Sequence, residues 1–179
     1  MRKWILLASL VVLGLLCLFS GTLFPETPVD EKSIPEFSSA DIAWMLVSSA
    51  MVLIMTPGLG FFYGGMVRKK NVISTILQSF IAMGVITVVW VVIGFGLAFG
   101  DSIGGIIGNP SKFLFFSNVG TKSAWSLAPT IPLILFAVFQ MKFAIITPAI
   151  ITGALAERIR FISFLLFICL FTLVIYTPL

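Results

Sequence analysis

The stretch FQMKFAIITPAIITGALAERIRF, residues 139–161, decides the fold of this chain. Between residues 139 and 156 the only charged residue is Lys142. A run of about 20 mostly apolar residues is long enough to cross the hydrocarbon core of a bilayer as a helix. A charge at the middle of a bilayer costs about 3 kcal/mol on insertion scales. The stretch therefore predicts a membrane helix that carries one unusual lysine.

The composition of the whole chain agrees with this prediction. Hydrophobic residues make up 59% of the 179 residues and charged residues only 10%, whereas about a quarter of a typical soluble domain is charged. Such a chain would expose large apolar patches in water. We therefore expect an all-α transmembrane protein. The net charge of +4 is explained by basic residues in the connections between membrane spans, which set membrane topology. No nucleic-acid partner is therefore expected.

The sequence offers few residues that could form a catalytic site or a metal site. The sequence contains no histidine, and its two cysteines, Cys17 and Cys169, lie in apolar runs. They provide neither a disulfide framework nor the spacing of metal ligands. No paired carboxylates and no nucleophile beside a base are evident. We therefore expect no enzymatic activity, no metal and no cofactor.

The N-terminal region differs from the rest of the chain. Arg2 and Lys3 precede an apolar run in residues 1–22, a pattern typical of a signal peptide. Because no clear cleavage site follows, an uncleaved anchor is the alternative. Residues 23–40 are polar and mostly acidic, and we expect them to form an extracytoplasmic linker.

Four apolar segments follow, and each has roughly the 20 residues that a membrane span requires. The expected spans are 41–66, 72–99, 127–156 and 161–179. The third should begin after Pro129 or Pro132, and the first has N-cap candidates at Ser38, Ser39 and Asp41. Its small residues suit close approach of a second helix; they are Gly58, Gly60, Gly64 and Gly65.

Positive charges mark two of the connections between these spans. The basic residues there are Arg68, Lys69 and Lys70 in the first connection and Arg158 and Arg160 in the last. The positive-inside rule therefore predicts cytoplasmic loops near 67–71 and 157–161, with the N-terminal linker outside. We expect a multi-pass protein of the plasma (inner) membrane. Glu157 is expected to form a salt bridge at the membrane surface rather than to relay protons.

Two long segments resemble one known family. The segment MTPGLGFFYGGMVRKKNV, residues 55–72, resembles the first transmembrane helix and loop of the ammonium transporter family (Amt/Mep/Rh). Residues 139–161 resemble the third helix of that family and the loop after it. Both matches are nearly uninterrupted, and the resemblance covers residues 40–179.

This resemblance implies both an architecture and a function. It implies the N-terminal four helices of an eleven-helix bundle that assembles as a homotrimer and passes ammonium or ammonia across the membrane. A small signal-transduction protein of the P-two type is the regulatory partner that the family implies on the cytoplasmic side. Since the family's later helices and pore histidines are not in this sequence, we expect an N-terminal fragment or a truncated product.

The resemblance also assigns candidate pore residues. Phe143 matches the first phenylalanine of the outer gate, and Phe139 matches the phenylalanine one turn earlier, at the vestibule. Tyr176 matches a tyrosine near the pore. In the implied mechanism, ammonium is recruited at an aromatic vestibule, loses its charge at the gate and crosses as the neutral molecule.

Lys142 departs from the family, which commonly has a small or apolar residue at this position. On a helical wheel it falls about 60° from Phe139 and about 100° from Phe143, at the edge of the pore side. Three interpretations stay open. In the first, the lysine is deprotonated or paired with an acid from a helix that is not in this sequence, and its role is structural. In the second, it contacts the pore and repels ammonium, as in a sensor or a non-conducting relative. In the third, it is a substitution in a decaying or truncated gene.

The leading functional hypothesis is ammonium transport by a longer chain of which this sequence is part. The first alternative is an ammonium sensor, in which a transporter-like module signals through an attached cytoplasmic domain. The second alternative is a truncated fragment without function.

Overall fold

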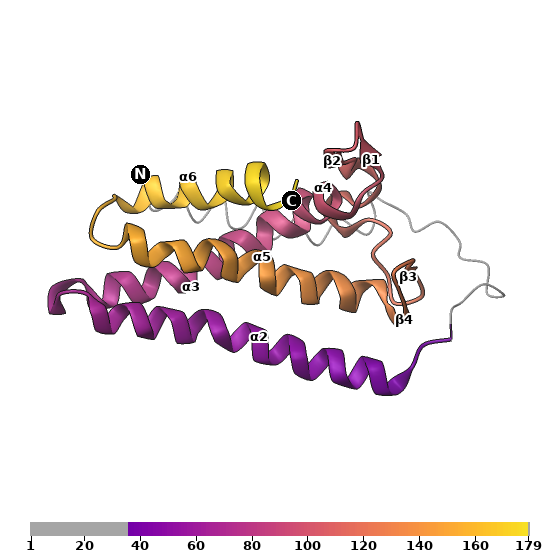
Figure 1. Cartoon of the computed structure of the whole chain (residues 1–179), viewed down its shortest axis with the longest axis horizontal. Helices are drawn as coiled ribbons and strands as arrows, with labels where there is room; N and C mark the ends of the chain where they lie inside the picture. Colours follow the sequence, from indigo (N-terminus) through magenta and orange to yellow (C-terminus); the bar gives the residue numbers. More distant parts are fainter. Residues whose placement is uncertain (1–35, 179) are drawn as a thin grey trace, which may run out of the picture.

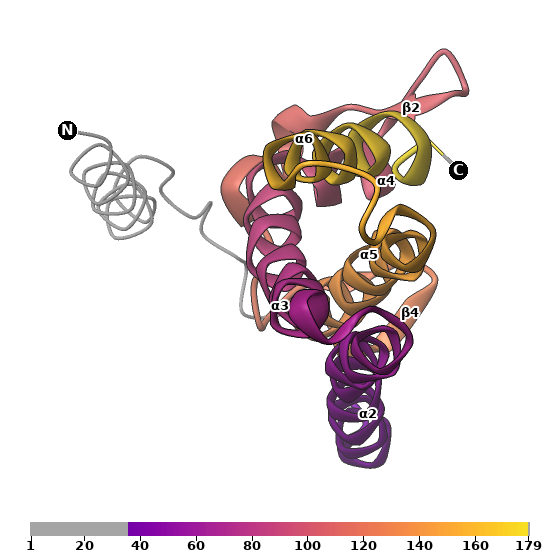
Figure 2. The ribbon, with the colours of Figure 1, turned by 90° about the vertical axis from the view of Figure 1, so that its left-hand side faces the viewer.

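A computed structural model describes residues 36–178 of the chain. The expected signal peptide or anchor, residues 1–22, and most of the linker lie outside these residues. The described residues form a bundle of four main helices (Figure 1): α2 (Ser39–Met66), α3 (Val72–Val89), α5 (Leu133–Leu155) and α6 (Phe161–Phe171). Helix α3 packs against α2, α5 and α6. Seen end-on, α2 lies to one side of the other three (Figure 2).

Helix α2 begins as its N-terminal residues predict. The Ser38 hydroxyl accepts a hydrogen bond from the backbone N–H of Asp41 at 3.3 Å and so caps the helix. Two of its four predicted packing glycines face α3: a Cβ on Gly60 would lie 3.0 Å from Ser79 Cβ, and one on Gly64 would lie 2.8 Å from Ile76 Cγ1. The other two, Gly58 and Gly65, have open space where a Cβ would be. Half of the glycine pattern therefore serves helix packing.

The second helical stretch is longer than α3 alone. A short turn, η2 (Lys69–Asn71), precedes α3, and a wider π-type turn, η3 (Trp90–Gly94), joins α3 to α4 (Phe95–Phe99). The resulting helix, Lys69–Phe99, is 31 residues long. Turns of the π type inside α-helices are uncommon, and this one begins at the buried Trp90.

The connection between α4 and α5 contains short strands and turns. Strands β1 (Ser102–Ile103) and β2 (Ile107–Gly108) form an antiparallel pair. After the turns η4 (Pro110–Lys112) and η5 (Leu114–Phe116), strand β3 (Ala124–Trp125) pairs with β4 (Ala128–Pro132), also antiparallel. Both pairs lie at the same end of the bundle as the start of α2 (Figure 1).

The third apolar segment becomes helical later than the range 127–156 suggests. Residues 128–132 form β4, and α5 begins at Leu133, directly after Pro132. Proline lacks a backbone N–H and pushes the residue before it toward an extended conformation. Two prolines, Pro129 and Pro132, therefore delay the helix, and of the two expected starting points the second is correct.

Three stretches in the described part of the chain are long and apolar enough to cross a membrane: Ser39–Met66, Lys69–Phe99 and Leu133–Leu155. The last helical stretch, Phe161–Tyr176, is apolar but shorter. It consists of α6 followed by a π-type turn, η6 (Thr172–Tyr176). The helical stretch ends at Tyr176, inside the expected span 161–179, and residue 179 lies outside the described residues.

Aromatic side chains fill the interior where α3, α5 and η6 meet the connection before α5. Trp90 is 1% exposed, and its ring centroid lies 6.1 Å from that of Phe95 and 6.3 Å from that of Phe99. The indole N–H of Trp90 donates a hydrogen bond to the carbonyl of Ala137 on α5 at 3.2 Å. A buried tryptophan usually finds such a partner. This bond fixes η3 against α5.

Candidate functional site

The candidate gate residue Phe143 and the candidate vestibule residue Phe139 lie together on α5. Phe139 and Phe143 are one turn apart, and their rings meet edge to face with centroids 5.1 Å apart and planes at 71°. Phe143 is 37% exposed, so the pair presents an accessible aromatic surface. An aromatic surface of this kind attracts a cation. The structure therefore brings these two sequence-predicted residues together.

Lys142 lies on the same turn of α5 as Phe143. Its side chain is half-buried, and its neighbours Met141 and Ala144 are buried. Within residues 36–178 no carboxylate forms an ion pair with it. The lysine therefore places an amine without an acidic partner beside the candidate gate.

Tyr176 lies in a different place from the other candidate residues. Its ring packs edge to face on Trp90, with centroids 6.1 Å apart and planes at 63°. It belongs to the aromatic interior between α3 and η6. Among the described residues, no ring contact joins Tyr176 to Phe139 or Phe143. The predicted residues thus form an aromatic pair on α5 and a separate tyrosine in the interior.

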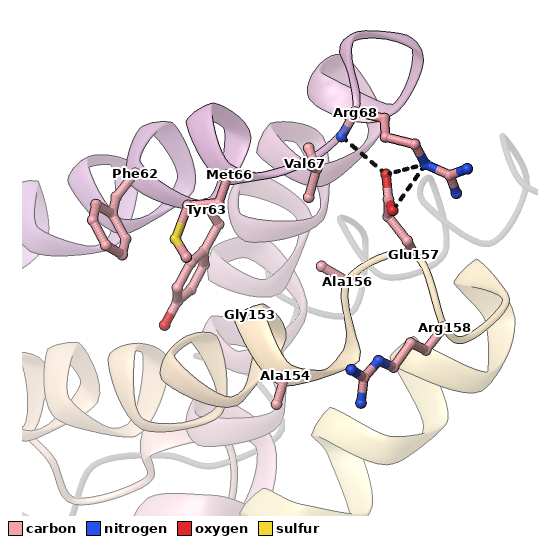
Figure 3. A pocket seen from close by; sticks show the side chains of 10 residues that line it. All are labelled: Phe62, Tyr63, Met66, Val67, Arg68, Gly153, Ala154, Ala156, Glu157 and Arg158. Carbon is pink, nitrogen blue, oxygen red and sulfur yellow. Dashed lines mark hydrogen bonds and ion pairs between the residues drawn. The ribbon is translucent and has the colours of Figure 1, made fainter.

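A polar junction lies at the end of the bundle where the two basic connections meet (Figure 3). The Glu157 carboxylate accepts hydrogen bonds from the Asn71 side chain at 2.6 Å, from the backbone N–H of Arg68 at 3.1 Å and from Arg68 Nε at 3.1 Å. The sequence predicted a salt bridge for Glu157 but named neither partner. These partners come from the α2–α3 connection, more than eighty residues earlier.

The backbone and the pKa of Glu157 both reflect this junction. Glu157 adopts a left-handed conformation with φ of 62°, which is uncommon for a residue with a side chain. The hydrogen bond from Asn71, followed by that from Arg68, lowers the pKa of the Glu157 carboxyl. Both donors stabilise the ionised form. Glu157 is therefore ionised at neutral pH and holds the two connections together.

A second contact joins α2 to α5 one turn further into the bundle. The Tyr63 hydroxyl donates a hydrogen bond to the carbonyl of Ile150 at 2.7 Å. A Cβ on Gly153 would lie 2.5 Å from Tyr63 Cε1, so only glycine leaves room for this ring. Tyr63 and Gly153 both occur in the two motifs quoted above, but their proximity is visible only in the structure.

A pocket of about 530 Å³ lies beside this contact, between the end of α2 and the α5–α6 connection (Figure 3). Its lining residues are Phe62, Tyr63, Met66, Val67, Arg68, Gly153, Ala154, Ala156, Glu157 and Arg158. The lining combines apolar side chains with two arginines, Arg68 and Arg158. Sequence reasoning did not identify the pocket, although the basic residues of the two connections were a signal for it. No three His, Cys, Asp or Glu side chains that could hold a metal gather in the described part of the chain.

Comparisons with known proteins agree on one family. A family model described as Ammonium Transporter Family matches residues 43–179. An ammonium transporter of Mycobacterium tuberculosis is 48% identical over 151 residues, which cover 77% of this chain and 32% of the relative. The chain spans about a third of the length of the curated relatives that it matches.

Solved structures resemble the fold as well. The crystal structure of Saccharomyces cerevisiae Mep2 superposes with a TM-score of 0.72 at 37% identity, over 80% of this chain and 31% of that protein. A structure described as a sensor Amt protein superposes with a TM-score of 0.67 at 30% identity, over 76% of this chain and 32% of that protein.

Proposed function

The chain belongs to the ammonium transporter family, and from this premise we propose that it is the helical N-terminal part of a protein that moves ammonium or ammonia across a membrane. The observation that carries the proposal is the match of the family model to residues 43–179, which include Phe139, Phe143 and Tyr176. The family resemblance and the all-α fold expected from the two motifs are both confirmed. The chain is a multi-pass membrane protein.

The proposed mechanism depends on the difference between a cation and its neutral form. The aromatic face of Phe143 attracts ammonium from water by a cation–π interaction of roughly 1–2 kcal/mol when the cation is partly desolvated. Moving an ion into an apolar environment is far more costly than moving a neutral molecule. Loss of a proton at the gate therefore lets ammonia continue through an apolar pore. Phe139 supports the Phe143 ring from one turn away.

The proposed location is based on the charge pattern, and the proposed assembly is based on the family. We propose the plasma (inner) membrane, with the linker 23–40 outside and the connections 67–71 and 157–161 in the cytoplasm. Within the family assignment, residues 41–179 form part of one transporter domain, which assembles as a homotrimer. A cytoplasmic signal-transduction protein of the P-two type is its proposed regulator.

An ammonium sensor is the second candidate. Two observations favour it. One is the likeness to the structure of a sensor Amt protein, and the other is the amine of Lys142 next to Phe143, which pairs with no carboxylate of residues 36–178. A fixed positive charge there would oppose passage of a cation while leaving the aromatic recruitment surface in place.

The reading frame and an uptake assay test these proposals. The nucleotide sequence after codon 179 is read first, and the whole frame is then expressed in cells that lack their own ammonium uptake. A transporter restores uptake of labelled methylammonium above the empty-vector control. A frame that continues into a kinase or cyclase, with uptake at the level of that control, identifies a sensor. A stop codon after Leu179 together with no uptake rejects both.

A further inference from the structure

We propose that the β1–β2 hairpin inserts the side chains of Ile103 and Ile106 into the lipid leaflet at its end of the bundle. The proposal requires only that the chain crosses a membrane, so it does not depend on what the protein transports. It assigns a partner to a segment that includes none of the candidate pore residues.

The turn of the hairpin fixes the position of both isoleucines. Gly104 and Gly105 have φ of 64° and 78°, the left-handed values that a type I′ turn requires. The backbone N–H of Ile106 donates a hydrogen bond to the carbonyl of Ile103 at 3.4 Å and closes the turn. Ile103 also pairs with Ile107 across the two strands. Ile103 and Ile106 therefore flank a closed turn at the tip.

The base of the hairpin is held against the end of α4. The backbone N–H of Asn109 donates a hydrogen bond to the carbonyl of Asp101 at 2.8 Å. A Cβ on Gly108 would lie 2.7 Å from the carbonyl oxygens of Gly96 and Leu97 in α4, so only glycine permits this close approach. The direction of the hairpin is therefore set by the helix against which its base packs.

This helix places the hairpin at the surface of the bilayer. The stretch Lys69–Phe99 is long and apolar enough to cross a membrane, and the hairpin begins shortly after its end, at Ser102. The ends of such a stretch lie where the hydrocarbon core meets the head groups. The hairpin extends sideways from the bundle, across the direction of the helices (Figure 1, Figure 2). It therefore runs along the membrane surface.

The tip of the hairpin is apolar and uncovered by the rest of the described chain. Ile106 is 75% exposed and Ile103 is 53% exposed. Residues 102–107 carry no charge, and the nearest acid, Asp101, pairs with Lys112 at 3.4 Å. Moving apolar surface out of water is favourable, and no charge has to enter the leaflet with these side chains.

Lipid fits this tip better than a protein partner does. A specific protein interface buries roughly 1,200–2,000 Å² in total, which is more than two side chains on a narrow hairpin provide. The leaflet surrounds a membrane protein at the level where the hairpin lies and makes no demand for a wide complementary surface. The tip is therefore continuous with the lipid-facing surface of the protein.

The accessibility of spin labels tests the proposal. The protein is expressed from its complete reading frame with its native cysteines replaced by alanine, and it carries Ile103→Cys, Ile106→Cys or Ser102→Cys. Each nitroxide-labelled protein is reconstituted into lipid nanodiscs. Power-saturation spectroscopy then measures collisions with oxygen, which concentrates in lipid, and with a nickel chelate, which stays in water. Ser102 is the matched control, because it is exposed and polar and successive residues of a strand point to opposite faces.

Labels at positions 103 and 106 should collide mainly with oxygen, and the label at position 102 mainly with the nickel chelate. Adding Ile103→Asp to the Ile106→Cys protein should shift its collisions toward nickel, since a carboxylate opposes insertion. Mainly nickel collisions at all three positions would overturn the proposal in favour of a tip in water. Few collisions with either reagent at 103 and 106 would overturn it in favour of a protein contact. Because transport is not measured, either failure leaves the proposed function untouched.

Discussion

Glu157 Oε2 lies 3.1 Å from Arg68 Nε, although the two residues are 89 positions apart in the sequence. The pair joins the connection after α2 to the connection after α5, and Asn71 adds a hydrogen bond at 2.6 Å. Because α2 and α5 also meet at Tyr63 and Gly153, the end of the bundle is held at two levels. The following predictions test these contacts and the candidate gate.

Replacing Glu157 with glutamine should lower the thermal stability of the full-length protein at pH 7, and this loss should become smaller as the pH falls below 4.5. The folded-state pKa of Glu157 is lowered from its usual value of 4.5. The stabilisation is therefore complete above pH 4.5 and is lost as the pH falls through the lower folded-state pKa. Thermal unfolding of the wild type and the variant in detergent, at pH 7 and at a series of lower pH values, measures the difference.

The control for this substitution is Asp101→Asn. Asp101 pairs with Lys112 at 3.4 Å, and the two side chains are 77% and 51% exposed. Such an exposed pair contributes little to stability. Equal unfolding temperatures for Glu157→Gln and Asp101→Asn at pH 7 would contradict the role given to Glu157.

Gly153→Ala should destabilise the protein by about 1–3 kcal/mol, the usual cost of inserting a methyl group into a packed interface. The new Cβ would lie 2.5 Å from the Tyr63 ring and displace the hydroxyl from the Ile150 carbonyl. Gly84→Ala on α3 is the control, because open space surrounds a Cβ there. Denaturation of both variants measures the difference, and equal stabilities would show that the Tyr63 ring moves aside freely.

Trp90→Phe should lower the free energy of unfolding by about 1 kcal/mol or more, because it removes the hydrogen bond to the Ala137 carbonyl and part of the aromatic packing. Trp90→Ala should cost about 3–5 kcal/mol, since the residue is 1% exposed and its loss leaves a cavity. Denaturant unfolding of the full-length wild type and of both variants measures these two differences. Equal losses for the two variants would mean that ring volume contributes nothing at this position.

Lys142→Met should lower the apparent free energy of membrane insertion of α5 by roughly 3 kcal/mol, because it removes a charge from the middle of the segment. Glycosylation mapping of α5 in microsomes measures the inserted fraction. Gln140→Met is the neighbouring control, since it changes polarity without changing charge. Equal effects of the two substitutions would show that Lys142 carries no charge penalty during insertion.

Phe143→Ala should raise the KM for methylammonium uptake by roughly 5–30-fold, if about 1–2 kcal/mol of cation–π attraction is lost. Phe171→Ala is the matched control. It belongs to the aromatic pair Phe167–Phe171 on α6, which has the same spacing and a centroid distance of 5.9 Å. Equal KM values for the two variants would contradict the proposed role of Phe143 in recruiting ammonium.

Features governed by nearby residues could be predicted from the sequence alone. Ser38 caps α2, and Pro132 marks the start of α5, because caps and prolines act on the backbone within a few residues. The contact between Phe139 and Phe143 follows from helical spacing. Hydropathy over about 20 residues was sufficient to recognise the membrane class. Two long motifs were sufficient to recognise the family.

Contacts between distant segments depended on the tertiary structure. The rotation of α2 against α3 decided that Gly60 and Gly64 face a neighbour while Gly58 and Gly65 do not. The packing of η6 against η3 placed Tyr176 on Trp90, away from Phe143. The partners of Glu157 and the pocket beside them also required the ends of α2 and α5 to be brought together. Local patterns specify helices, but side-chain contacts depend on how those helices are rotated and positioned against one another.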